Sequence, residues 1–394
     1  MLQVSAGGAG GSSNPAVTVS SAPAGLPAVN VDSVATRLLA AAVATWQLSV
    51  VSADSNQGLR PTRLFAFGRW HYAQVPAQPQ GTVAFFPGCA RAARGFFPFD
   101  PSPGGCSECL GLPEELAQTK QALRRGYAVL ALAPKDLKHL CWSSSSEPQQ
   151  NDQAQAQSIL IDFLLANGLH TKPLYVTVVS TPEARSWGIF VGDNQTLKLP
   201  VYPPTLFVGM AGDAWGVSQA PKCANLLRRN NVPSGFVISP ERRFTPTGLS
   251  DRVPVVTPQQ SAAIVSALQA VGILNASGWV VANPQGYNDR RSPVFGWVRD
   301  VYRLLPWMAG GSPSLNLELR TSAIFQELGV AYARHESIAD YFTACLMWLE
   351  TGGAGNFAQM AVAYKRTRLS LLTADTQLPP PPKPRPPPPP PKPR

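Results

Sequence analysis

Short apolar runs separated by longer amphipathic stretches dominate the middle of the chain. The runs lie at 82–86 (TVAFF), 127–133 (YAVLALA), 174–179 (LYVTVV) and 205–210 (TLFVGM). A continuous apolar run of this length is typical of a strand covered on both faces of a sheet. We therefore expect these four strands to be neighbours in one sheet, with 127–133 in its interior. The remaining stretches predict helices, which span 113–125, 153–166, 218–229, 259–271, 321–333 and 338–350.

The expected helix 113–125 (PEELAQTKQALRR) carries terminal features of its own. Proline stands in its first turn, acidic residues follow it, and two arginines precede Gly126 at its end. Each placement suits a helix terminus or the helix dipole. Strands that alternate with such helices predict an α/β fold, a mostly parallel sheet with helices on both faces.

Both ends of the chain differ in composition from this middle. Residues 1–30 are rich in Gly, Ser, Ala and Pro and are predicted to be disordered. The tail from Pro379 (PPPPKPRPPPPPPKPR) should be a stiff, solvated polyproline II rod, because proline fixes φ and lacks the N–H. The expected organisation is a low-complexity segment 1–54, a folded domain 55–372 and a proline-rich tail 373–394.

Charge and hydropathy exclude two classes of partner. Four of the positive charges lie in the tail, so a net charge of +10 leaves +6 for the rest of the chain. No stripe of arginine and aromatic residues accompanies them, which argues against nucleic-acid binding. No apolar span reaches 18 residues, which argues against an integral membrane helix.

One stretch bears on the compartment. Arg37 is followed by LLAAAVATWQLSVV and then by Val51-Ser52-Ala53, so that 37–53 is similar to a signal peptide with its cleavage site. The same stretch also reads as an amphipathic or buried helix. The sequons at Asn194 and Asn275, together with six cysteines, are compatible with secretion. The secretory or extracellular interpretation is favoured over the cytoplasmic one.

Several segments along the middle resemble one known family. They are Pro87-Gly88-Cys89, the block CSECLGLPEE at 106–115, RGYAVL at 125–130, Cys141-Trp142, YPPTLFV at 202–208 with Asp213, LSDRVP at 249–254 and His335-Glu336. Over roughly residues 80–350 the chain resembles a plant and algal branch of the α/β-hydrolase superfamily. The cysteine-containing block is the most specific part of that resemblance.

The resemblance implies a serine hydrolase that acts on an ester or acyl substrate without a cofactor. Ser180 would be the nucleophile, Asp213 would orient the imidazole, and His335 would be the general base. The backbone N–H groups of Gly88 and Cys89 would bind the oxyanion.

The residues around Ser180 depart from this pattern. A nucleophile elbow needs very small residues two positions before and after the serine, where this chain has Val178 and Pro182. Ser180-Thr-Pro-Glu183 also fits a helix capping box, and TPEAR (181–185) could instead join two strands of a hairpin. Only 24 residues separate Ser180 from Thr205, so the region is shortened as well.

These departures leave two functions open. One is a serine hydrolase with impaired catalysis. The other is a non-catalytic binding or extracellular-matrix module that uses the hydrolase fold and the proline-rich tail. The tail itself could enter an SH3-type groove, join a cell-wall matrix or serve as a spacer. Asp213 and His335 also have structural interpretations, as a turn aspartate and as the residue that opens the expected helix at its sequence HESIAD (335–340).

Four cysteines could form a structural site: Cys89, Cys106, Cys109 and Cys141. Disulfides fit best if the protein is secreted. A zinc site ranks second, since it would usually show two close cysteine pairs, and only one exists here. Redox catalysis ranks third, because a thioredoxin-like CxxC should directly open a helix after a strand. We expect Cys106 and Cys109 on a surface loop, with Cys89 or Cys141 nearby.

Overall fold

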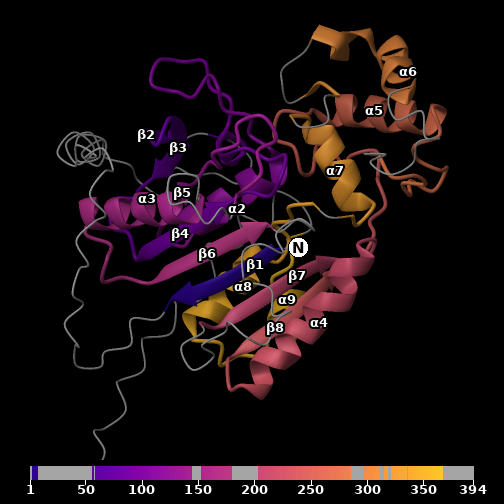
Figure 1. Cartoon of the computed structure of the whole chain (residues 1–394). Coiled ribbons are helices and arrows are strands. Elements are labelled where there is room, and N and C mark those ends of the chain that lie inside the picture. The colour runs from indigo at the N-terminus through magenta and orange to yellow at the C-terminus, as the bar shows by residue number, and fades with distance from the viewer. Residues whose placement is uncertain are drawn as a thin grey trace, which may run out of the picture.

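The structure is a computed structural model that describes residues 2–7, 56, 58–143, 152–179, 203–284, 296–310, 315–317, 321–334 and 336–366 (Figure 1). Eight strands of this part of the chain form one sheet in the order β2-β3-β5-β4-β6-β1-β7-β8. The strands are β1 (Leu2–Gly7), β2 (Thr62–Ala66), β3 (Arg69–Gln74), β4 (Gly81–Phe86), β5 (Tyr127–Ala131), β6 (Leu174–Val179), β7 (Thr205–Met210) and β8 (Ser234–Ser239).

The sheet is mixed, with most of its strands running in one direction. β4 is parallel to β5 and β6, and β7 is parallel to β8. β3 is antiparallel to β2 and β5, and β1 is antiparallel to β6 and β7. Six of the eight described strands therefore share a direction, and β1 and β3 oppose them. The α/β class is confirmed, and the four apolar runs each form a strand, although the run 127–133 ends its strand at Ala131.

β1 is the main departure from expectation. It belongs to the segment 1–30 that was predicted to be disordered, and it pairs through Val4 with Thr177 of β6 and with Leu206 of β7. The strands 174–179 and 205–210 were expected to be neighbours. This expectation is wrong, because β1 lies between them. Composition averaged over a Gly- and Ser-rich segment hides a strand of six residues, because long-range pairing rather than local pattern places it.

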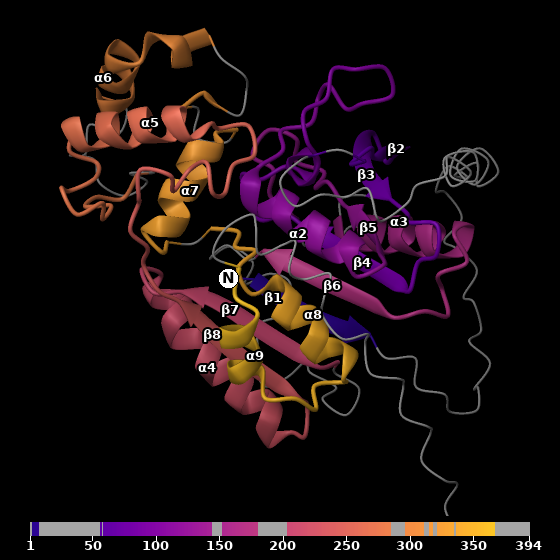
Figure 2. The ribbon, with the colours of Figure 1, turned by 180° about the vertical axis from the view of Figure 1, so that it is seen from behind.

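Helices cover both faces of the sheet (Figures 1 and 2). On one face, Leu123 of α2 and Phe342 of α8 share a buried core with Phe85 and Val129 of the central strands. On the other face, α3 covers β5 and α4 covers β7 and β8. The helices are α2 (Pro113–Arg124), α3 (Asp152–Ala166), α4 (Ala214–Arg229), α5 (Pro258–Ala270), α6 (Gly296–Leu304), α7 (Ala323–Ala331), α8 (Phe342–Glu350) and α9 (Phe357–Ala363), with short 3₁₀ turns η2 (Ala93–Phe96) and η5 (Pro306–Gly310).

Helix ends follow capping side chains rather than the apolar pattern. The expected helix 218–229 begins a turn earlier, at Ala214, because the Asp213 side chain accepts the Gly216 N–H. The expected helix 321–333 shortens to α7, which Ser322 caps. The expected helix 338–350 begins only at Phe342, so the sequence 336–340 is not helical and the prediction that His335 opens this helix is wrong.

Two features of the sheet were not predicted. The first is the hairpin of β2 and β3, whose turn residues Phe67 and Gly68 both have positive φ, 49° and 76°. The second is β8, whose half-buried sequence SGFVIS gives a weak strand pattern.

A helical unit stands apart from the sheet (Figures 1 and 2). The chain enters it after β8, and α5, α6 and α7 pack around a separate core that includes Leu268, Val301 and Phe325. Figure 1 shows β6 and β7 pointing toward this unit, so it lies beyond the carboxyl edge of the sheet. None of the helices in the described ranges has the length and hydropathy to cross a bilayer.

Candidate active site at the carboxyl edge of the sheet

Three strands that carry candidate residues end at one edge of the sheet. β4, β6 and β7 share a direction, and Phe86 near the end of β4 pairs with Val178 near the end of β6. In open α/β sheets, ligands bind in the crevice beyond the carboxyl ends of the strands. Ser180 follows β6 directly in the chain. Ser180 and His335 themselves lie outside the described residues, so the site is defined by the segments that flank them.

Asp213 lies in the turn after β7. Its carboxylate Oδ1 accepts the Gly216 N–H at 3.1 Å and so caps α4. The side chain is half-buried. The structural interpretation of this aspartate is therefore correct, and its position at a strand end also suits the orienting role implied by the resemblance.

The segment that flanks His335 packs against the turn that leads to Asp213. The Gly212 N–H donates to the Ala333 carbonyl at 2.8 Å. A Cβ atom at Gly212 would lie 2.8 Å from the Tyr332 carbonyl oxygen, so only glycine allows this approach. On the other side of His335, the Glu336 N–H contacts the Met210 sulfur at 3.3 Å. Asp213, the candidate orienting residue, and His335, the candidate base, thus belong to adjoining backbone segments.

Gly88 and Cys89 begin the loop that follows β4. Gly88 is buried, and within the described residues neither its N–H nor that of Cys89 has an acceptor. The Gly88 carbonyl instead accepts the Arg91 N–H at 3.0 Å, which turns the loop back on itself. Two successive N–H groups that have no acceptor among the described residues, just after a strand end, suit an incoming oxyanion.

No family model, no curated protein and no solved structure matches this chain. The assignment of a function therefore depends on the geometry of this edge and on the residues that flank it.

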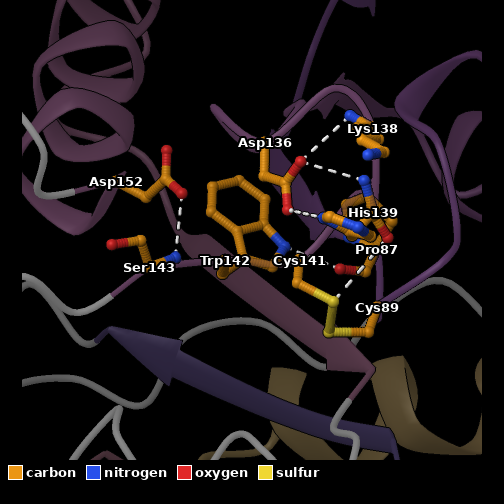
Figure 3. Close-up of a disulfide and its surroundings, with 9 residues drawn as sticks. All are labelled: Pro87, Cys89, Asp136, Lys138, His139, Cys141, Trp142, Ser143 and Asp152. Atoms are coloured by element: carbon orange, nitrogen blue, oxygen red, sulfur yellow. Dashed lines mark hydrogen bonds and ion pairs between the residues drawn. A yellow bond between two sulfur atoms is a disulfide. The ribbon is translucent and has the colours of Figure 1, made fainter.

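The loop after β4 is fastened to the loop after β5 (Figure 3). Cys89 and Cys141 form a disulfide, and the Trp142 indole N–H donates to the Pro87 carbonyl at 2.7 Å. The Ala90 N–H donates to the His139 carbonyl at 3.1 Å. These three contacts hold the loop after β4, which carries the Gly88 and Cys89 N–H groups, against the loop after β5. Pro87 has no backbone N–H, so it takes part in this network only through its carbonyl oxygen, which accepts the Trp142 N–H.

The same neighbouring loop is organised by Asp136. Its carboxylate accepts the backbone N–H groups of Lys138 and His139, at 3.0 and 2.9 Å, and lies 2.9 Å from the His139 ring nitrogen Nδ1 (Figure 3). These hydrogen bonds lower the pKa of Asp136. His139 therefore serves the loop structurally.

The other two candidate cysteines form a second disulfide. Cys106 and Cys109 bridge within the loop between β4 and α2. Both are buried, although they were expected on a surface loop, and each pairs with the other rather than with Cys89 or Cys141. All four cysteines are thus placed in disulfides, the arrangement the sequence favours. Cys223 and Cys345 are buried free thiols.

A buried ion pair, which the sequence did not predict, connects two of the segments that flank the site. Arg91, in the loop after β4, pairs with Glu336, the residue that follows His335. Glu115 of α2 lies nearby, and burial raises the pKa of its carboxyl to about 7 despite the opposing effect of Arg91. Arg91 and Glu336 thus join the loop that carries the amide donors to the segment that carries the candidate base.

His71 belongs to the fold rather than to this site. It is buried in β3, and its Nδ1 accepts the Ala133 N–H at 3.1 Å. Burial, together with the nearby Arg69 guanidinium, lowers the pKa of His71 to about 3. A neutral imidazole fixed as an acceptor in the sheet needs no catalytic explanation.

Proposed function

We propose that the chain is a serine hydrolase of ester or acyl substrates with slow catalysis at the carboxyl edge of the sheet. Ser180 is the nucleophile, His335 the general base, and Asp213 the group that orients the imidazole. The N–H groups of Gly88 and Cys89 stabilise the oxyanion.

The observation that carries this proposal is the bond from the Gly212 N–H to the Ala333 carbonyl. It brings the segments of two proposed catalytic residues together from positions more than 100 residues apart in the chain. The Arg91–Glu336 ion pair supports it, because it ties the loop with the open amide donors to the same segment.

The proposed reaction has two steps. The Ser180 Oγ attacks the carbonyl carbon as His335 takes its proton, and the same imidazolium then protonates the departing alcohol. Water, deprotonated by His335, adds to the acyl-enzyme and releases the acid and free Ser180. In both steps the negative charge that develops on the carbonyl oxygen is met by the backbone donors.

The residues beside the nucleophile account for the slow rate. Val178 is embedded in the sheet, where it pairs with Phe86 of β4 and Gln3 of β1. A valine in place of glycine at this position restricts the sharp turn that an exposed nucleophile needs, and Pro182 restricts it further.

A fluorophosphonate probe tests this function, because it reacts preferentially with activated serines. We expect slow labelling of Ser180, found by peptide mass spectrometry, and its loss in both Ser180→Ala and His335→Ala. Ser218→Ala, which changes an exposed serine of α4, should label like the wild type. Labelling that persists in Ser180→Ala would contradict the assignment of the nucleophile.

A second candidate function is favoured by one observation, the loss of both small residues around Ser180. In that case the fold is a non-catalytic binding module, and the proline-rich tail is its interaction element. Folded protein that takes up no probe at any serine would support this module and exclude the hydrolase.

A further inference from the structure

Six charged side chains, five of them buried and Arg242 half-buried, lie together where α2, the helical unit and the segment after α9 meet. Arg252 is at the centre, with Nη2 2.8 Å from Glu114 Oε1 and 2.6 Å from Asp340 Oδ1, and Nε 2.8 Å from Glu327 Oε2. Arg242 and Arg366 complete the cluster through ion pairs with Asp340 and Glu114 respectively. The formal charges are three positive and three negative.

All three guanidinium groups of this cluster have buried donors without a hydrogen-bond acceptor among the described residues, and Glu327 Oε1 is a buried acceptor without a donor there. Arg252 Nη1 and Arg242 Nη2 are buried and make no hydrogen bond within the described part of the chain. The Arg252 side chain is only 7% exposed. Arg242 Nη2 lies 3.7 Å from Glu327 Oε2, beyond hydrogen-bond distance. A buried charged donor without an acceptor is costly, so these atoms indicate a missing partner.

Both arginines line a pocket of about 180 Å³ at the junction between the sheet and the helical unit. Arg243 lies on its exposed side, and Glu327 and Asp251 are its acidic residues. One Asp251 oxygen already accepts the Thr247 hydroxyl at 3.0 Å. Burial raises the pKa of Glu327 to about 7 against the influence of Arg252, so near neutral pH this carboxyl is partly protonated. Three arginines and two acids line the pocket, so its lining has an excess of positive charge, while Glu114 and Asp340 pair with Arg252 and Arg242 outside the lining.

We propose that this pocket binds a compact oxyanion, a carboxylate or a phosphate group, through Arg242, Arg243 and Arg252. Guanidinium groups offer forked donors that match the paired oxygens of both anions. The volume far exceeds the roughly 10–15 Å³ that a single water needs. Arg243 and Thr245 of the lining are exposed, so an anion can approach the pocket from solvent. The proposal does not depend on catalysis at Ser180.

Anion binding in this pocket would also affect the backbone that leads to the candidate active site. The backbone N–H of Arg242 donates to the carbonyl of Ala331, the last residue of α7, at 2.9 Å. The next residues of that segment are those that pack on Gly212. An anion held by Arg242 would therefore fix the backbone that leads to His335.

Titration calorimetry on the full chain tests the site with sodium phosphate, sodium sulfate and sodium acetate at constant ionic strength. We expect saturable binding at one site per chain. Binding of phosphate and sulfate alone would identify a phosphate site, and binding of acetate alone a carboxylate site. Binding of all three would identify a general oxyanion site.

Matched variants locate the binding. Arg243→Gln leaves the buried cluster intact and should weaken binding by about tenfold or more, as expected for a lost charged hydrogen bond. Arg242→Gln should weaken it further, and if that variant does not fold, Arg243→Gln decides. Arg229→Gln, on the exposed face of α4, should bind like the wild type. No saturable binding by any anion, or unchanged affinity in Arg243→Gln, would overturn the proposal.

Discussion

Glu114 and Glu115 are consecutive residues in the first turn of α2, both are buried, and their pKa values shift in opposite directions. Burial favours the neutral form of each carboxyl. For Glu114, three arginines led by Arg252 outweigh burial and lower the pKa. For Glu115, burial prevails and raises the pKa to about 7. Identical residues one position apart thus hold different charges, because a helix turns them toward different partners.

Glu115 makes stability depend on pH. The folded protein keeps this proton up to about pH 7, whereas the unfolded chain releases it near pH 4.5. The free energy of unfolding should therefore fall as pH rises from 5 to 8, by on the order of 2 to 3 kcal/mol for this residue. Glu115→Gln keeps an acceptor for Gln326 and should lose that part of the pH dependence.

Urea denaturation of the wild type and Glu115→Gln at pH 5, 6, 7 and 8 measures this difference. Glu327, whose pKa is also raised to about 7, is present in both proteins and cancels in the comparison. Glu108→Gln, at a partly exposed ion pair with Arg63, is the matched control and should follow the wild type. Parallel stability curves for wild type and Glu115→Gln would contradict the prediction.

Residue-scale features differ in how far the sequence predicts them. Asp213 and Gly88 could be placed at strand ends, since each follows an apolar run. The Arg91–Glu336 pair could not, because its members are 245 residues apart and no local pattern predicts that the two residues contact each other. Arg252 was visible only as part of a family-like segment, and its burial with three acids depends on tertiary packing.

At the scale of elements, the two disulfides close chain loops of very different length. Cys89–Cys141 spans 52 residues and Cys106–Cys109 spans three. Loop-closure entropy predicts a stabilisation of about 4 kcal/mol for the first and about 2 kcal/mol for the second. We expect the double variant Cys89→Ala/Cys141→Ala to be less stable than Cys106→Ala/Cys109→Ala.

Chemical denaturation of both double variants under non-reducing conditions provides the measurement. Both pairs are replaced by alanine, so each variant loses two sulfur atoms. Cys106 and Cys109 are buried whereas Cys89 and Cys141 are half-buried, so lost packing adds more to the effect at the shorter loop. Equal losses of stability, or a larger loss at Cys106 and Cys109, would show that local packing outweighs chain entropy here.

Strands and helices were predicted where their burial requires a run or a spacing of apolar residues in the local sequence. The runs at 127–133 and 205–210 are apolar throughout because both faces of these strands are covered. The hairpin of β2 and β3 was not predicted because both strands contain polar residues, in β2 at the edge of the sheet and in β3 as buried side chains such as His71. Helix ends shifted by a few residues because capping side chains, rather than apolar spacing, decide where a helix begins.

At the scale of the whole molecule, the described chain is needed as far as Arg366. This side chain is buried, pairs with Glu114, and its backbone N–H donates to the Asp340 carbonyl at 2.8 Å. Arg366→Met should lower the free energy of unfolding by about 3 to 5 kcal/mol, because it leaves buried acids short of a partner.

The proline-rich tail should behave in the opposite way. Deletion of residues 379–394, which lie outside the described residues, removes no apolar side chains beyond proline rings. We expect an unchanged melting temperature in calorimetry for this truncation and a clear drop for Arg366→Met. A drop of several degrees in the truncated protein would show that the tail belongs to the fold.

The position of β1 has a consequence for how the protein is synthesised. Residues 2–7 pair with strands that begin at Leu174 and Thr205, so their partners leave the ribosome only after some two hundred residues have been made. Until then the early segment has nothing to pair with, and once it pairs with β6 its other edge stays open until β7 has been made. Such distant pairing slows folding and exposes intermediates to aggregation. A protease that cut after Ala53, at the signal-like motif, would remove β1 and separate the five strands that end with β6 from β7 and β8.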